Sequence, residues 1–156
     1  MAEPLAKKRK TLQNLRDDLQ LNRVMAYFQE HPKTWQDMQD IVARKPGCLS
    51  LRALEFFCTK MAAKNNLFIK NGEKFVPVHK EYVNCLNTHK KKGFDSFRRQ
   101  GKNKDSCITI YLHDTEFSTT LAQLTFFMLM DQKGILQHAT DQRKEIVEAM
   151  RKKSRE

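Results

Sequence analysis

The apolar residues of this chain recur at helical spacing in short segments, several of which stop at a proline or a glycine. Leu12, Leu15 and Leu19 begin the first of these patterns, which ends before Pro32. Proline lacks the amide hydrogen that a helix interior needs, and glycine favours helix ends, so short helices are expected. The predicted helices cover residues 11–30, 34–44, 50–64, 80–91, 120–133 and 140–150.

Polar residues placed to cap helices mark where several of these segments begin. Ser50 lies between Leu49 and Leu54, which are spaced as a hydrophobic staple, and Thr120 precedes Gln123 by three positions, as in a capping box. We therefore predict helix N-caps at Thr34, Ser50, Thr120 and Thr140.

Three short segments have the composition of strands. Residues 67–69 and 75–78 flank Asn71-Gly72, a strong hairpin signal because both residues tolerate positive φ. Pro77 cannot donate to a strand ladder, so its strand is expected at an edge. Residues 107–112 are β-branched and aromatic and predict a third strand. The sequence thus predicts a helix-dominated α+β fold.

The predicted order of the first half, three helices followed by a hairpin, matches that of a winged helix, with additional helices after it. In winged helices the third helix enters a major groove and the hairpin contacts the phosphate backbone. The alternative is that the third helix is core structure. Its outward positions are predicted to be Arg52, Glu55, Thr59, Lys60 and Lys64.

Charge is distributed unevenly along the 156 residues, which carry a net charge of +11. Residues 64–104 alone hold eleven basic and three acidic residues, a net charge of +8. Such a field attracts polyanions but does not indicate a fold. The length suits one domain, so we predict a basic flexible N-terminus over 1–10, a single globular domain over 11–150 and a frayed basic tail over 151–156.

The basic middle segment supplies the candidate nucleic-acid contacts. Lysines surround the predicted hairpin, and residues 90–105 read as a basic loop in which Phe94 and Phe97 alternate with cations. These rings could stack on bases or could instead anchor the loop to the core. The predicted contact residues are Lys70, Lys74, Lys80, Lys90, Lys91, Lys92, Arg98, Arg99, Lys102 and Lys104.

Targeting signals and sites for chemistry are few. Lys7, Lys8, Arg9 and Lys10 follow a proline and resemble a nuclear import signal, although a phosphate-binding arm or a solvated terminus would have the same composition. We find no signal-peptide core and no apolar run long enough to span a bilayer, so an intracellular protein is expected.

We predict neither a catalytic site nor a bound metal or cofactor. Cys85 and His89 lie one helical turn apart, but no Cys-x-x-Cys pair accompanies them to complete a zinc site. The four cysteines are expected to be reduced thiols in apolar surroundings. No phosphate-cradling glycine motif is present. A non-enzymatic protein is therefore expected.

Three segments together resemble the short basic proteins of the nucleo-cytoplasmic large DNA viruses, the iridoviruses and their relatives. They are residues 50–57 (SLRALEFF), 91–99 (KKGFDSFRR) and 119–127 (TTLAQLTFF). The resemblance covers roughly residues 50–130. It implies a viral protein made in an infected cell and supplies no activity, because no function is established for that family.

Two functions are consistent with these features. The first is a nucleic-acid-binding protein, with DNA favoured, that acts in viral genome packaging or transcription in the nucleus or cytoplasm. The alternative is a structural virion component or a host-virus interaction module that binds other virion proteins or itself. The apolar stretch 121–130, beside an acidic region, motivates this alternative, because it could form an interface.

Overall fold

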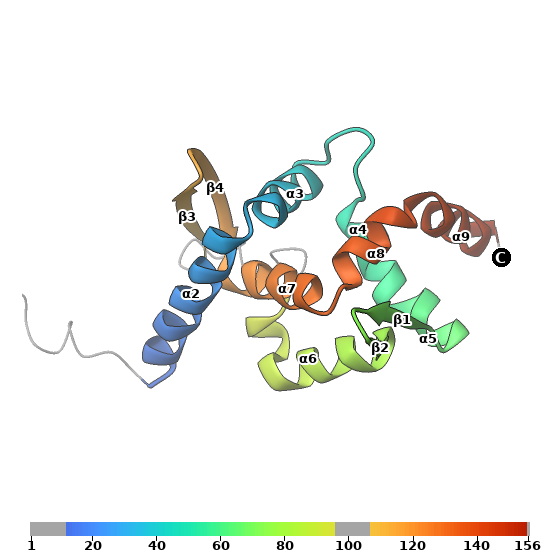
Figure 1. The fold of residues 1–156 in the computed structure, drawn as a ribbon, viewed down its shortest axis with the longest axis horizontal. Coiled ribbons are helices and arrows are strands. Elements are labelled where there is room, and N and C mark those ends of the chain that lie inside the picture. The colour runs from blue at the N-terminus through green and yellow to red at the C-terminus, as the bar shows by residue number, and fades with distance from the viewer. Residues whose placement is uncertain (1–11, 96–106, 156) are drawn as a thin grey trace, which may run out of the picture.

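The computed structural model describes residues 12–95 and 107–155 (Figure 1). The predicted flexible N-terminus, including Lys7, Lys8, Arg9 and Lys10, lies outside the described residues, as do Phe97, Arg98, Arg99, Lys102 and Lys104. The first-half elements are α2 (Leu12–Glu30), α3 (Pro32–Val42), α4 (Leu51–Phe56), the π-helical segment η1 (Phe57–Met61), α5 (Ala62–Asn65), β1 (Phe68–Asn71) and β2 (Lys74–Pro77). The second-half elements are α6 (Val78–Gly93), β3 (Cys107–Leu112), β4 (Thr115–Thr120), α7 (Leu121–Gln132), α8 (Ile135–Asp141) and α9 (Arg143–Arg155).

Helix α7 is the centre of the core. It is apolar around nearly its whole circumference, and it packs against α2, α6 and α8 (Figure 1). Thr120 caps it as predicted, because the Thr120 hydroxyl accepts a hydrogen bond from the Gln123 amide at 3.2 Å. Residues 122–128 and Met130 are buried. Stretch 121–130 is therefore not available as an interface, since most of it is buried in the core.

Helices α2 and α3 meet α7 through a shared carboxylate. Asp131, at the end of α7, accepts hydrogen bonds from the Tyr27 hydroxyl and from the Thr34 hydroxyl, the latter at 3.0 Å. Thr34 is not the N-cap that we predicted, because Pro32 supplies the first turn and α3 begins there. Thr34 instead lies buried within the helix.

The first turns of α2 differ from the prediction. Leu15 and Leu19 belong to the apolar pattern that predicted this helix, but they are 48% and 69% exposed. Val24 and Phe28, further along the same helix, are fully buried. The helical period was correct, and the core begins later along the helix than the pattern indicated.

The third helix is continuous from Leu51 to Asn65 but contains the π-helical segment η1. The Ser50 hydroxyl accepts a hydrogen bond from the Ala53 amide at 3.0 Å, which confirms the predicted cap. Leu54 and Phe57 are buried on one side of this helix. The alternative that the third helix is core structure is therefore correct for that side.

Two antiparallel hairpins complete the fold. In β1–β2, Asn71 pairs with Lys74, so the turn residues are Gly72 and Glu73 and not Asn71-Gly72 as predicted. The Asn71 side chain instead donates to the Gln132 carbonyl at 3.2 Å, which holds the hairpin against the end of α7.

The second hairpin pairs the predicted strand β3 with β4, which was not predicted. Its turn residues, His113 and Asp114, both have positive φ, the geometry of a type I′ turn, although neither is the usual asparagine or glycine. The sequence therefore carried no strong turn signal at this position.

The C-terminal part holds two helices where one was predicted. Thr140 is not a cap: it lies within α8, and its hydroxyl donates to the Leu136 carbonyl at 2.8 Å. Helix α9 continues past Arg151 to Arg155, so the segment predicted as a frayed tail is helical through that residue.

The helix-dominated α+β fold is confirmed, and so is the order of three helices and a hairpin in the first half. These elements do not enclose a separate core, because α7 packs between them and the buried apolar residues of both halves form one cluster. Within the described ranges, no helix combines the length and apolarity needed to cross a membrane.

Candidate nucleic-acid interface

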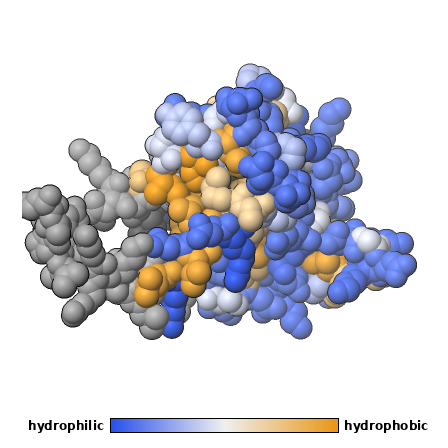
Figure 2. Space-filling view, turned by 60° about the vertical axis from the view of Figure 1, so that its left-hand side comes forward, coloured by the Kyte–Doolittle hydropathy of each residue, from blue (hydrophilic) through white to orange (hydrophobic). Residues whose placement is uncertain are grey.

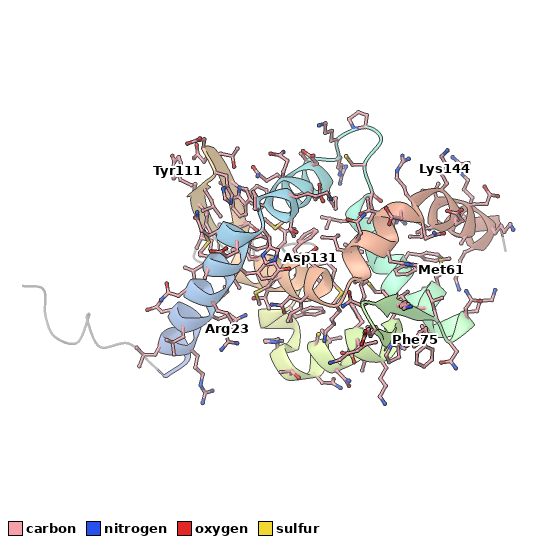
Figure 3. The ribbon with its side chains drawn as sticks, viewed as in Figure 1. Arg23, Met61, Phe75, Tyr111, Asp131 and Lys144 are labelled. Atoms are coloured by element: carbon pink, nitrogen blue, oxygen red, sulfur yellow. The ribbon has the colours of Figure 1, made fainter. Side chains whose placement is uncertain are left out.

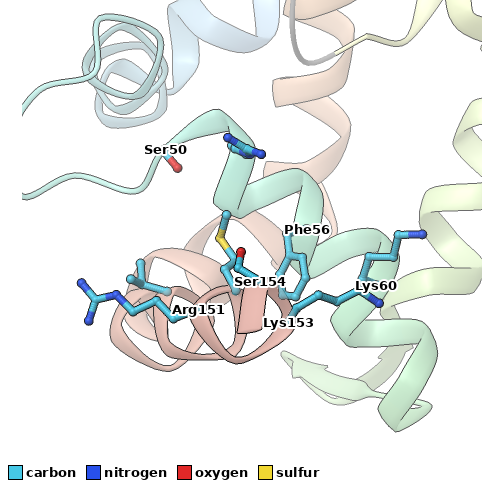
Figure 4. A pocket seen from close by; sticks show the side chains of 9 residues that line it. Ser50, Phe56, Lys60, Arg151, Lys153 and Ser154 are labelled. Carbon is cyan, nitrogen blue, oxygen red and sulfur yellow. The ribbon is translucent and has the colours of Figure 1, made fainter. Parts of the chain in front are cut away.

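A cleft of about 740 Å³ lies between the third helix and α9 (Figure 4). The two helices pack directly against each other, and α9 also contacts η1. In α9, Val147, Met150, Arg151 and Ser154 recur three or four positions apart, so they lie on one face of the helix. The cleft is lined by Ser50, Arg52, Phe56, Lys60, Val147, Met150, Arg151, Lys153 and Ser154.

The lining combines an apolar floor with a cationic rim. Phe56, Val147 and Met150 are half-buried, whereas the side chains of the four cations are exposed. Of the described residues that line the cleft, none is acidic. Glu148 lies nearby and approaches Arg151 at 3.9 Å, but both groups are more than half exposed, so this ion pair is weak. The rim cations are Arg52, Lys60, Arg151 and Lys153.

The π-helical segment helps to place one of these cations. A π-turn inserts an extra residue into a helical turn and is frequent at functional sites. Here it covers Phe57–Met61 and carries Lys60, while Phe57 and Cys58 in the same turn are buried. Figure 4 shows Phe56 and Lys60 from the third helix and Arg151 and Lys153 from α9 around the same space.

The outward face predicted for the third helix is largely confirmed. Arg52, Lys60 and Lys64 are exposed, whereas Glu55 and Thr59 are half-buried. The Thr59 hydroxyl donates to the Glu55 carbonyl at 2.8 Å. Three cations therefore follow the exposed side of the helix, and two of them line the cleft.

The predicted contact residues are divided between two places. Lys70 and Lys74 are exposed on β1–β2, and Lys80 is exposed in the first turn of α6. Lys90, Lys91 and Lys92 belong to the last turn of α6, so the helix predicted to end at residue 91 continues through Gly93, and residues 90–93 are not part of the predicted loop. At 1.5 Å per residue, Lys80 and Lys90 are separated by about 15 Å along the helix. Among the described residues, the lysines of the basic middle segment are thus spread along α6 and the hairpin and do not form one patch.

Phe94 is an anchor and not a stacking surface. Its ring is 2% exposed and lies 5.6 Å from the Tyr82 ring and 5.1 Å from the Phe126 ring. The next residue, Asp95, is also buried, and its amide donates to the Ala122 carbonyl at 3.2 Å. Of the two uses considered for this ring, the structural one is confirmed.

The thiols and the imidazole considered for chemistry lie in environments that disfavour charge. Burial raises the pKa of the Cys58 thiol, which is fully enclosed, and also raises the pKa of Cys85. Burial, assisted by the charge of Arg23, lowers the pKa of His89. Protonated thiols are poor nucleophiles and poor metal ligands. No three potential ligand side chains come together at a metal-sized site in the ranges that the structure describes.

A family model described as a family of unknown function (DUF7197) matches residues 5–156. This chain therefore belongs to that family. No curated protein and no solved structure gives a match.

Proposed function

We propose that this protein is a non-enzymatic nucleic-acid-binding protein and that the cleft between the third helix and α9 contacts the phosphate backbone. The observation that supports this most strongly is the convergence of Arg52, Lys60, Arg151 and Lys153 around a space with no acidic lining among the described residues. Cations from segments far apart in sequence are brought together there. A lysine-rich face kept only for solubility would not need this convergence.

The chemistry of the cleft suits a polyanion with apolar parts. Arginine and lysine bind phosphate oxygens, and the release of condensed counterions drives the association. The hydroxyls of Ser50 and Ser154 add hydrogen-bonding groups at the rim. The floor formed by Phe56, Val147 and Met150 offers a surface for sugars or base edges. Lys64, Lys70 and Lys74 extend the positive charge beyond the cleft.

For the biological setting, we propose that DNA is the preferred ligand and that the protein acts in viral genome packaging or transcription, in the nucleus or cytoplasm of an infected cell. The resemblance of residues 50–57, 91–99 and 119–127 to short basic viral proteins supports the viral part. Lys7, Lys8, Arg9 and Lys10 support nuclear import. Arg98, Arg99, Lys102 and Lys104 stay predicted phosphate contacts.

The alternative function is a virion structural or host-virus interaction module. The apolar stretch 121–130 does not support it, because most of that stretch is buried. The observation that now favours it is the exposure of Leu15 and Leu19, one helical turn apart on α2. Figure 2 shows apolar side chains gathered on the face of the molecule that carries the first turns of α2. If this alternative holds, Leu15→Gln/Leu19→Gln should abolish self-association measured by light scattering, with nucleic-acid affinity absent throughout.

The location of the interface is tested by charge reversal. We would measure fluorescence anisotropy of labelled duplex DNA, single-stranded DNA and RNA of about 30 nucleotides at roughly 100 mM salt. Arg52→Glu/Lys60→Glu should weaken binding strongly to every ligand bound by the wild type. The matched control is Arg23→Glu/Arg44→Glu, which makes the same change in net charge at exposed positions on α2 and after α3. Equal losses in both variants would refute a localised interface.

A further inference from the structure

The outer face of hairpin β1–β2 presents two exposed aromatic rings. Phe68 is 53% exposed and Phe75 is 69% exposed. The register places Phe75 directly across from Lys70 and Phe68 across from Pro77. Because side chains alternate between the two faces of a strand, Phe68, Lys70 and Phe75 share one face. We call these three residues the hairpin platform.

The opposite face of the hairpin is fixed to the rest of the protein. Ile69 is 3% exposed and belongs to the core, and Val76, paired with it, is half-buried. Asn71 is held to the Gln132 carbonyl at 3.2 Å, and the Val78 amide donates to the Leu67 carbonyl at 3.1 Å. These contacts hold the hairpin in a defined position, so the two rings are presented outward on a rigid support.

The charges around the platform indicate what it could bind. Between residues 60 and 80 the chain has five lysines and one acidic residue, Glu73 in the hairpin turn. Lys70 stands beside Phe75 on the platform, and Lys74 precedes it in the strand. Figures 1 and 3 place the hairpin and α9 toward the same end of the long axis of the molecule. The rings therefore lie in a cationic region, which attracts polyanions, and exposed rings beside cations are the combination that stacks nucleic-acid bases.

We infer that the hairpin platform stacks unpaired bases, so that this protein binds single-stranded nucleic acid in preference to a duplex. This inference rests on the proposed function and specifies its ligand. Exposed aromatic rings stack on bases of any sequence, while neighbouring cations follow the phosphate backbone. Diagonal positions of a hairpin are about 7–8 Å apart, so each ring can take a separate base. In a duplex, the base faces are already stacked on one another.

The other hairpin supplies a matched control. Tyr111 on β3 is 74% exposed, so its ring is at least as accessible as that of Phe75. It stands opposite Glu116, whereas Phe75 stands opposite Lys70. Figure 3 shows Tyr111 and Phe75 at opposite ends of the molecule. The effect of removing an exposed ring can thus be compared between a hairpin position opposite a lysine and one opposite a glutamate.

The test measures the affinity of Phe68→Ala, Phe75→Ala and Tyr111→Ala for labelled oligothymidylate of about 15 nucleotides and for a duplex of the same length. Each phenylalanine replacement should weaken oligothymidylate binding roughly 5- to 150-fold, the effect of losing one stacked base. Duplex affinity should change less than about 2-fold, and Tyr111→Ala should match the wild type for both ligands. Phe75→Trp should retain binding and show fluorescence quenching by oligothymidylate.

Thermal unfolding of each variant separates ring loss from misfolding, and Phe75→Trp provides a second, conservative readout. The inference is overturned if Phe68→Ala and Phe75→Ala bind oligothymidylate as the wild type does. It is also overturned if these variants change only the oligomeric state, which would assign the rings to a protein contact. In either case, duplex binding that is sensitive to Arg52→Glu/Lys60→Glu would leave the proposed function intact. A wild type that binds no nucleic acid would refute both.

Discussion

Replacing Gly134 by alanine should destabilise this protein more than the same replacement at Gly47, because only the first introduces a contact with hairpin β1–β2. Both glycines have positive φ, +78° at Gly134 and +86° at Gly47. A Cβ atom added at Gly134 would lie 2.8 Å from Oδ1 and 2.9 Å from Cγ of Asn71, whereas one added at Gly47 would meet nothing within 4 Å. The comparison isolates the contact that holds the hairpin, and with it the platform.

The size of the effect follows from two contributions. A side chain in the left-handed region costs about 1–2 kcal/mol, and this applies at both sites. The Asn71 side chain can rotate away from the new methyl group, but it then loses its hydrogen bond to the Gln132 carbonyl. That loss costs about 0.5–1.5 kcal/mol. Gly134→Ala should therefore lower the free energy of unfolding by about 1.5–3.5 kcal/mol, and the extra contribution should lower Tm by about 1–6 °C.

Urea unfolding followed by the fluorescence of Trp35 provides the assay, because Trp35 is the single tryptophan of the sequence and is 1% exposed. A double-mutant cycle with Asn71→Ala isolates the contact. In the Asn71→Ala background, Gly134→Ala should cost less than in the wild type, because only the backbone contribution and the contact with the Cβ of residue 71 at 3.2 Å remain. The reasoning is refuted if Gly134→Ala costs no more than Gly47→Ala in the wild type, or if its cost is unchanged by removal of the Asn71 side chain.

Three further predictions concern the core. Tyr27→Phe should lower the free energy of unfolding by roughly 1.5–3 kcal/mol, since a hydrogen bond to a charged group is lost. Burial first, then the hydrogen bond and charge of Asp131, raise the pKa of Tyr27. The folded state therefore favours the protonated phenol, so the stability of the wild type should fall above about pH 10, more steeply than that of Tyr27→Phe. Urea melts at a series of pH values measure this, and parallel stability profiles of the two proteins would contradict it. Cys58 and Cys85 should react with a thiol reagent only on unfolding, whereas the half-buried Cys48 and Cys107 should react in the native state. Mass spectrometry of the labelled protein identifies the sites, and labelling of Cys58 in the native state would count against the fold. Thr120→Ala should cost about 0.5–2 kcal/mol through loss of the α7 cap, measured by the same urea assay, and no loss would mean that the cap is dispensable.

The sequence predicted correctly those helix starts that depend only on neighbouring residues. Ser50 and Thr120 cap their helices because each has a hydroxyl three residues before the amide that it accepts from. Thr140 failed as a cap because a threonine hydroxyl can also bond to the carbonyl four residues earlier within a helix, as Thr140 does to Leu136. Thr34 failed because Pro32 begins the helix earlier.

Positions decided by tertiary packing were not predictable in the same way. The periodicity of α2 does not indicate that the core covers Val24 and Phe28 but leaves Leu15 and Leu19 exposed. Strand β4 was missed because its turn residues carry positive φ without the usual glycine or asparagine. In both cases the local sequence was compatible with more than one arrangement.

The candidate site shows the same limit. The sequence singled out the continuous basic segment 64–104, but helix α6 carries Lys80 and Lys90 about 15 Å apart. The cleft instead joins Arg52 and Lys60 with Arg151 and Lys153, which lie some ninety positions later in the chain. The outward face predicted for the third helix supplied half of this set. The contribution of α9 required knowledge of which helices pack together.

The central claim is most directly tested by the salt dependence of nucleic-acid binding by the wild type. The apparent association constant for a labelled duplex of about 30 base pairs would be measured between about 50 and 300 mM salt. If the four cleft cations each neutralise one phosphate, the slope of log Kobs against log salt should be about −3.6 or steeper, because each contact contributes about −0.9. A slope near zero, or no binding at about 100 mM salt, would contradict the account.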